Sequence, residues 1–224
     1  MKNIKKALLG LLSFFFLSQF VLAQTLEGVI SYSIEYEVVQ DDRMDLEIYK
    51  AMIPHKMELS LKGANSHLKF VGGMTQGLLG DILYQSKEKN LYSIMDFNKT
   101  VTKTSVEELT QGMLKTGFKA QKTSDTASVL GYFCAKYVVK DEKEGTETSL
   151  WCTKSISNAS ASVMVFFLQS MTQFGVSGVE GLPLKIQFKG KEFDLTLLAN
   201  NKEQKQLPAT LFEIPKGYKL NNMN

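Results

Sequence analysis

Cys134 and Cys152 are the only cysteines of this 224-residue chain, and their spacing suits a disulfide. The segments Gly131 to Val139 and Ser149 to Thr153 each read as a strand, and Gly145 between them can take the positive φ of a tight turn. A hairpin folded about its midpoint would place the cysteines directly opposite, with Cα atoms roughly 4.5–5.5 Å apart. The sequence therefore predicts a Cys134–Cys152 disulfide, and two free, buried thiols are the alternative.

Other residues with catalytic or ligand chemistry are scattered along the chain. His55 and His67 are the only histidines, and a zinc site would need further ligands brought near them. The acidic stretch 41–45 lacks the glycine and terminal glutamate of a calcium loop. The segment Gly175 to Gly178 misses the Gly-x-Ser-x-Gly spacing of a hydrolase, and no glycine-rich loop ends in the Gly-Lys-Ser/Thr of a phosphate site. The sequence predicts no enzyme, no metal site and no cofactor.

The charge of the chain excludes a class of partner. The formal net charge is +3, but Lys2, Lys5 and Lys6 lie ahead of a long apolar run. Without those three lysines, 23 basic residues face 23 acidic ones. Nucleic-acid binding needs a cationic surplus, so no nucleic-acid partner is expected.

Residues 1–23 have the layout of a secretory signal peptide. The lysines precede an apolar run that ends in Val21-Leu22-Ala23, with small residues at the −3 and −1 positions before Gln24. The run is short for a membrane span, which needs roughly 20 residues. We expect cleavage near Ala23–Gln24, a periplasmic or secreted product without a transmembrane segment, and one domain over residues 24–224. A monomer is the expected state.

The mature segment alternates between apolar and polar residues, as strands with one buried face do. Ile30, Tyr32, Ile34, Tyr36 and Val38 share one face of the first such strand. Similar alternation follows around residues 57–61, 68–70, 82–85, 91–97, 184–188 and 193–197. About nine or ten strands at this spacing predict an antiparallel meander.

Two segments instead have helical signatures. Ser105 and Glu108 form a capping box ahead of an apolar stripe. Ser157–Met171 is apolar on nearly every side and too short for a membrane span, so this helix must be buried. The predicted fold is mainly antiparallel β with helices: an unclosed half-barrel wrapped over a buried helix.

Four short segments, in this order, resemble a known family. They are Gly131–Val139, Leu150–Lys154, Gly181-Leu-Pro-Leu-Lys185 and Phe212-Glu-Ile-Pro-Lys-Gly-Tyr218. They resemble an uncharacterised family of small exported proteins of the Gram-negative envelope, which is grouped with the LolA-like, lipoprotein-carrier superfamily. The resemblance implies the same unclosed β-barrel over helices. A carrier function would rest on fold analogy alone.

Two functions remain open. The first is an envelope carrier that holds a hydrophobic or lipid-like ligand between the concave sheet and the helix Ser157–Met171. The contacts expected there are Tyr36, Met164, Phe167 and Trp151, whose ring should point inward, opposite Ala135. The second is a non-enzymatic structural or protein-interaction module of the envelope with a filled core. The nine methionines outside the signal segment suit an adaptable apolar site, but also core filling.

Overall fold

The computed structural model describes residues 26–39, 51–74, 79–116, 118–156, 163–164, 166–168, 176–191 and 193–222. The predicted signal peptide lies outside these residues, as do parts of the helix predicted for Ser157–Met171. No described helix is long and apolar enough to cross a membrane.

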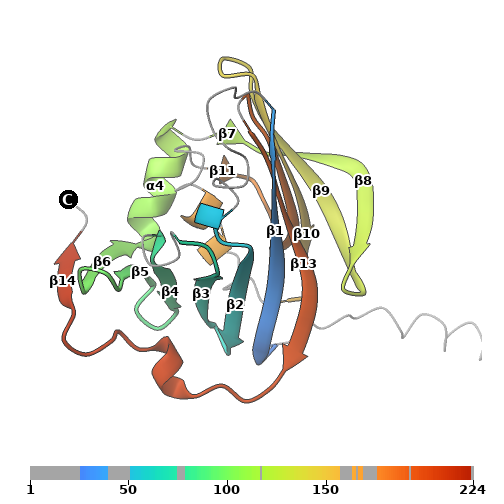
Figure 1. The fold of residues 1–224 in the computed structure, drawn as a ribbon. Helices are drawn as coiled ribbons and strands as arrows, with labels where there is room; N and C mark the ends of the chain where they lie inside the picture. The colour runs from blue at the N-terminus through green and yellow to red at the C-terminus, as the bar shows by residue number, and fades with distance from the viewer. Residues whose placement is uncertain are drawn as a thin grey trace, which may run out of the picture.

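Twelve strands form one large sheet that is not closed into a barrel (Figure 1). The first meander contains β1 (Gly28–Val38), β2 (Lys56–Lys62), β3 (Asn65–Val71), β4 (Asp81–Gln85), β5 (Asn90–Met95) and β6 (Thr100–Ser105). The second contains β8 (Gln121–Val129), β9 (Tyr132–Asp141), β10 (Thr146–Thr153), β12 (Leu182–Lys189) and β13 (Phe193–Gln204). β14 (Lys219–Asn222) pairs in parallel with β6, and all other pairs in this sheet are antiparallel. The prediction of a mainly antiparallel, unclosed sheet is confirmed.

The two meanders meet where β1 pairs with β13. Their register runs from Gly28 opposite Gln204 to Val38 opposite Phe193, with one irregularity at Ser31/Tyr32. The period of two predicted for β1 is confirmed, because Ile30 and Tyr32 are fully buried and the alternating Glu35 is exposed. This long antiparallel pair makes the two meanders one continuous sheet.

Helix α4 (Val106–Thr116) follows β6 and leads to a small parallel sheet made of β7 (Phe118–Lys119) and β11 (Val176–Ser177). The predicted capping box is present: the Ser105 Oγ accepts the N–H of Glu108 at 3.1 Å, and the Glu108 carboxylate accepts the N–H of Ser105 at 3.0 Å. These hydrogen bonds hold the pKa of Glu108 below its ordinary value. The helix therefore begins where the sequence predicts.

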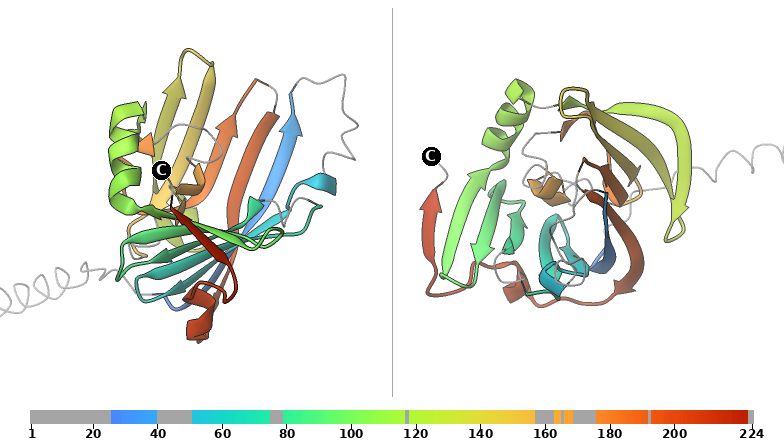
Figure 2. Two further views of the ribbon diagram at one scale, coloured as in Figure 1. Left: turned by 90° about the vertical axis from the view of Figure 1, so that its left-hand side faces the viewer. Right: turned by 45° about the horizontal axis from the view of Figure 1, so that its top comes forward.

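The main core lies on the concave side of the sheet. Helical residues Val163, Met164, Phe167 and Leu168 are buried there, inside the curve of the strands (Figure 2). The Phe167 ring packs 5.3 Å from that of Phe70 on β3. The prediction of a buried helix against the concave face is confirmed for the helical residues that the structure describes.

A second apolar cluster lies on the other face of β4–β6. Residues 205–222, here termed the C-terminal strap, cross this face and include the 3₁₀ helix η2 (Ala209–Phe212). Leu207 and Phe212 are buried against Leu83, Tyr92, Ile94 and Val101. The Lys62 ammonium donates to the Leu207 carbonyl, the Gln85 amide donates to that of Phe212 at 2.8 Å, and the Tyr218 hydroxyl donates to Asp96 at 2.7 Å. The strap thus fills the face that the main core leaves open.

The predicted cysteine pairing is wrong by one residue. Asp141 pairs with Thr146, so the turn between β9 and β10 has four residues and its centre lies half a residue later than predicted. Cys152 consequently lies opposite Ala135. Both cysteines are free and buried, which is the alternative that the sequence left open. Burial raises the pKa of the Cys134 thiol to about 11 and raises that of Cys152 further.

Candidate functional site: a cleft beside the β9–β10 turn

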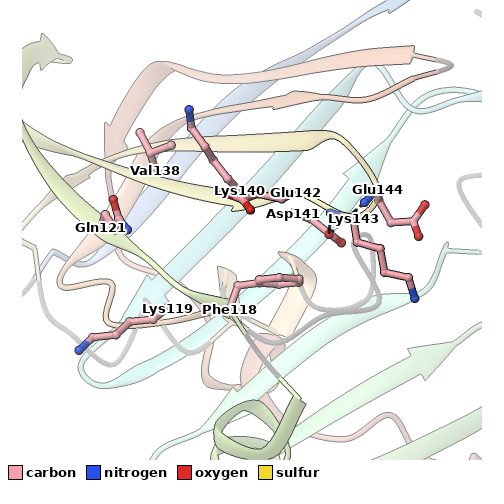
Figure 3. A pocket seen from close by; sticks show the side chains of 9 residues that line it. All are labelled: Phe118, Lys119, Gln121, Val138, Lys140, Asp141, Glu142, Lys143 and Glu144. Atoms are coloured by element: carbon pink, nitrogen blue, oxygen red, sulfur yellow. Dashed lines mark hydrogen bonds between the residues drawn. The ribbon is translucent and has the colours of Figure 1, made fainter.

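A cleft of about 690 Å³ lies between β7 and the turn that joins β9 to β10 (Figure 3). Its lining residues are Phe118, Lys119, Gln121, Val138, Lys140, Asp141, Glu142, Lys143 and Glu144. Clefts of about 300–1,000 Å³ are the usual size for small-molecule sites. The volume is therefore sufficient for a small ligand.

One wall of the cleft is β7, which β11 holds in place. Phe118 pairs with Val176 and Lys119 with Ser177 in the parallel register. The Ala120 N–H donates to the Ser177 carbonyl at 2.8 Å, and the Ser177 hydroxyl donates to the Phe118 carbonyl at 3.4 Å. Phe118 is partly buried against the main core, and its ring extends toward the turn in Figure 3. It gives this wall an apolar surface.

The opposite wall is the turn itself, which a buried carboxylate shapes. The Asp141 Oδ1 accepts the backbone N–H groups of Lys143 and Glu144, both at 3.0 Å. Asp141 is buried, and Gly145 supplies a φ of +66° at the end of the turn. The sequence folds this way because aspartate accepts such local hydrogen bonds and glycine tolerates positive φ. Asp141 is thus engaged in the turn, while its neighbours face the cleft.

The charges around the cleft balance, with three lysines and three carboxylates. Lys140 is paired with Glu147 at 3.2 Å, and Glu144 lies 3.7 Å from Lys191. Within the described parts of the chain, Lys119, Glu142 and Lys143 form no ion pair. These three side chains can therefore pair with a ligand of either sign.

The four residues predicted to contact a ligand do not line this cleft. Met164 is fully buried, and Phe167 packs against Phe70 in the core. Tyr36 lies near the end of β1, with its ring 6.4 Å from that of Phe193.

Trp151 lies on the other face of the sheet, and the prediction that it is opposite Ala135 is wrong. It pairs with Lys136 of β9 and with Lys185 of β12. Its half-buried ring lies 5.2 Å and 4.5 Å from the two ammonium nitrogens. The later turn centre also explains why Trp151 pairs with Lys136 and not with Ala135. It shifts the β9 partner of every β10 residue by one position.

Sequence reasoning missed the cleft because no motif marks it. In the sequence, Phe118 is a single aromatic residue between the helix and a polar strand, so no apolar pattern marks it. The acidic and basic residues 140–144 have the composition of an ordinary solvated turn. The one available signal was the placement of Asp141 four residues before Gly145, which is typical of a tight turn with a side-chain acceptor.

The side chains that line the cleft are an aromatic ring, an amide, a valine, lysines and carboxylates. None of its lining residues is a serine, threonine, cysteine or histidine. His67 instead contacts Asp81 at 3.1 Å on β3 and β4. Throughout the described residues, no group of three or more His, Cys, Asp and Glu side chains is arranged to hold a metal ion. The arrangement suits binding by an aromatic surface and by the charged side chains that form no ion pair.

Comparison with known proteins gives a family and distant structural neighbours. No curated protein matches the chain. Two crystal structures of PNGF-II are similar to it, with 12% sequence identity and TM-scores of 0.46 and 0.47. The similarity covers 88% of this chain but only 31% and 32% of those chains, so this chain spans about a third of their length. The family profile of DUF4412, a domain of unknown function, matches residues 42–218. The chain therefore belongs to the DUF4412 family.

Proposed function

We propose that this protein is an exported, non-enzymatic binding protein of the bacterial envelope, with a LolA-like half-barrel fold. It holds an amphipathic, lipid-like ligand in the cleft between β7 and the β9–β10 turn. The observation that carries the proposal is a cleft of about 690 Å³ with the Phe118 ring on one wall and unpaired charges at its rim.

The ligand's location follows from packing. Val163, Met164, Phe167 and Leu168 are buried against the concave face of the sheet, where the sequence placed the ligand. The cleft at the end of this core offers Phe118 and Val138 to an apolar group, and lysine stems add further apolar surface. The Lys119 and Lys143 ammonium groups can pair with an anionic head group.

Native mass spectrometry of the full-length gene product, purified from its own envelope, tests the binding proposal. We expect a bound species that organic extraction removes, and a mature chain that begins at Gln24. Lys119→Glu together with Lys143→Glu should weaken retention at least tenfold, because each change places a carboxylate beside an anionic group. Lys216→Glu is the matched control, since this exposed lysine lies on the strap, outside the cleft lining. Ligand-free protein, or equal retention in all variants, would contradict the proposal.

The burial of the described helical residues Val163, Met164, Phe167 and Leu168 supports a second candidate, a structural or interaction module of the envelope. Under this alternative, the cleft binds nothing, and the Lys119→Glu, Lys143→Glu variant keeps the biological activity of the parent protein. Complementation of a deletion strain by that variant therefore distinguishes the two functions.

A further inference from the structure

Trp151 and two lysines form a row across three strands of the sheet, away from the cleft. Lys136 on β9, Trp151 on β10 and Lys185 on β12 are direct antiparallel partners. We propose that this row is a binding site for a tetrahedral oxyanion, a phosphate or sulfate group.

The backbone register fixes the geometry of the site. Directly opposed residues of an antiparallel pair project to the same face. Leu150 and Cys152, on either side of Trp151, are buried in the main core, so the indole ring projects to the convex face. The Lys136 Nζ lies 5.2 Å and the Lys185 Nζ 4.5 Å from the centre of that ring. Both ammonium groups therefore share one aromatic side chain.

The charge of the row favours an anion. The strands that carry the two lysines lie two strand spacings apart, about 9.5 Å, so their ammonium groups repel each other. The Asp125 carboxylate lies 3.5 Å from Lys136, but its side chain is 64% exposed. Lys185 forms no ion pair with any described residue. An anion at the row would be attracted by both ammonium groups at once.

The side chains of the row itself, Lys136, Trp151 and Lys185, offer only hydrogen-bond donors. Each ammonium group carries three N–H donors, and the indole carries one at Nε1. The Nε1–H has no hydrogen bond to the described residues. A tetrahedral oxyanion has enough acceptor oxygens to bind both lysines at once, in charge-assisted hydrogen bonds. The cleft differs from this site, because three carboxylates line it together with three lysines, whereas the row has one neighbouring carboxylate, that of Asp125.

The fluorescence of Trp151 tests the site directly, because it is the only tryptophan of the chain. Titration with inorganic phosphate and with sulfate, against sodium chloride at equal ionic strength, should give a saturable change in emission for the oxyanions alone. Lys185→Met and Lys136→Met should each weaken binding about tenfold, the loss of one charge-assisted hydrogen bond. Lys189→Met, four residues further along β12, is the matched control and should bind as the parent protein does.

A parallel arm identifies the source of the oxyanion. Vesicles of phosphatidylglycerol that change the emission, while phosphatidylcholine vesicles do not, would assign it to an anionic lipid head group. A response to free phosphate without a vesicle response would assign it to a soluble ligand. Both results support the site if Lys185→Met reduces the response and Lys189→Met does not. An emission spectrum unchanged by either probe, or equal responses in both variants, would overturn the proposal.

Discussion

Single residues explain why the motif Gly181-Leu-Pro-Leu-Lys185 stands out in the sequence. Gly181 has a φ of +89°, and a Cβ there would lie 2.2 Å from the Thr153 carbonyl oxygen. Pro183 lies at the irregularity in the pairing of β10 with β12, a position where a strand tolerates a residue without an N–H. Its carbonyl accepts the hydroxyl of the buried Tyr32 at 3.0 Å. The motif is therefore structural, because it lets β12 pass close to the end of β10.

Replacing Gly181 should measure how much stability depends on the close approach of its backbone to that of Thr153. Gly181→Ala combines a strained φ with a clash against backbone atoms, so we expect the free energy of unfolding to fall by about 3 kcal/mol. Gly217→Ala is the control, since Gly217 has a similar φ of +83° but nothing within 4 Å of the added Cβ. It should lose only about 1 kcal/mol. Urea unfolding of the three proteins measures both values, and equal losses would contradict the steric argument.

The buried thiols predict a loss of stability at high pH. The unfolded chain releases its thiol protons near pH 8.5, whereas burial holds the folded pKa of Cys134 at about 11 and raises that of Cys152 further. The unfolded state then binds fewer protons, so the free energy of unfolding should fall from about pH 9 upward, by at most about 1.4 kcal/mol per pH unit for each thiol.

Denaturant unfolding between pH 8 and pH 10.5 measures this slope. The Cys134→Ala, Cys152→Ala protein should have a flatter profile. A thiol reagent should find two reactive thiols in the denatured, unreduced protein and none in the native one. Identical slopes in the two proteins would show that the thiols titrate alike in both states.

At the scale of elements, the C-terminal strap takes the place of a second layer. It covers the face of β4–β6 opposite the main core, where alternating residues such as Leu83 and Tyr92 would otherwise be exposed. Its end, β14, then pairs with β6 and adds one more strand to the sheet. The strap therefore stabilises the first meander from its outer side.

Phe212 should account for much of that stabilisation. Its side chain is 5% exposed within the second cluster, so Phe212→Ala should lower the free energy of unfolding by about 3–5 kcal/mol. Leu220→Ala, on β14, removes a side chain that is 53% exposed and should change it by less than about 0.5 kcal/mol. Calorimetry or urea unfolding provides the comparison. A small loss for Phe212→Ala would mean that the strap contributes little.

The elements that could be predicted from the sequence are those marked by a strict local pattern, either apolar–polar alternation or a capping motif. The alternation of β1 and the Ser105–Glu108 capping box each depend on local chemistry, and the structure contains both. β8 was missed because Val129 is its only buried residue, so it carries no apolar period. The pairing of β9 with β10 was misjudged by one residue because the turn centre depends on the hydrogen bonds of Asp141. The cleft was missed for a related reason: its walls meet only through the tertiary fold.

At the scale of the whole molecule, the sheet has two edges, and they are protected differently. One edge is the short β14. The other is β8, whose pairing with β9 is interrupted between Lys122 and Thr126. There the Thr123 hydroxyl donates to the Lys136 carbonyl at 3.5 Å and accepts the Asp125 N–H at 3.1 Å. Such bulges and charges hinder the pairing of an edge with another chain.

This edge predicts a monomer in solution, with a mass of about 23 kDa after removal of the signal segment, estimated from the usual mass per residue. Deleting Ser124 and Asp125 would remove two of the three residues that oppose Lys136 and give β8 a regular edge. We expect that variant to form dimers or larger species at micromolar concentration. Size-exclusion chromatography with light scattering measures both masses, and Asp125→Asn is the control that keeps the bulge. A dimeric parent protein would show that the bulge does not protect the edge.

The pairing of β1 with β13 also fixes the order in which the molecule can fold. The first strand to be synthesised pairs with β2 on one side but waits for its second partner near the other end of the chain, since Gly28 pairs with Gln204. Each meander can begin to form from local hairpins, but their junction has a high contact order and closes a very long loop. The sheet therefore becomes continuous only when synthesis is nearly complete. On the proposed export route, this delay would keep the precursor unfolded, and so able to be threaded through a membrane, until almost the whole chain has been made.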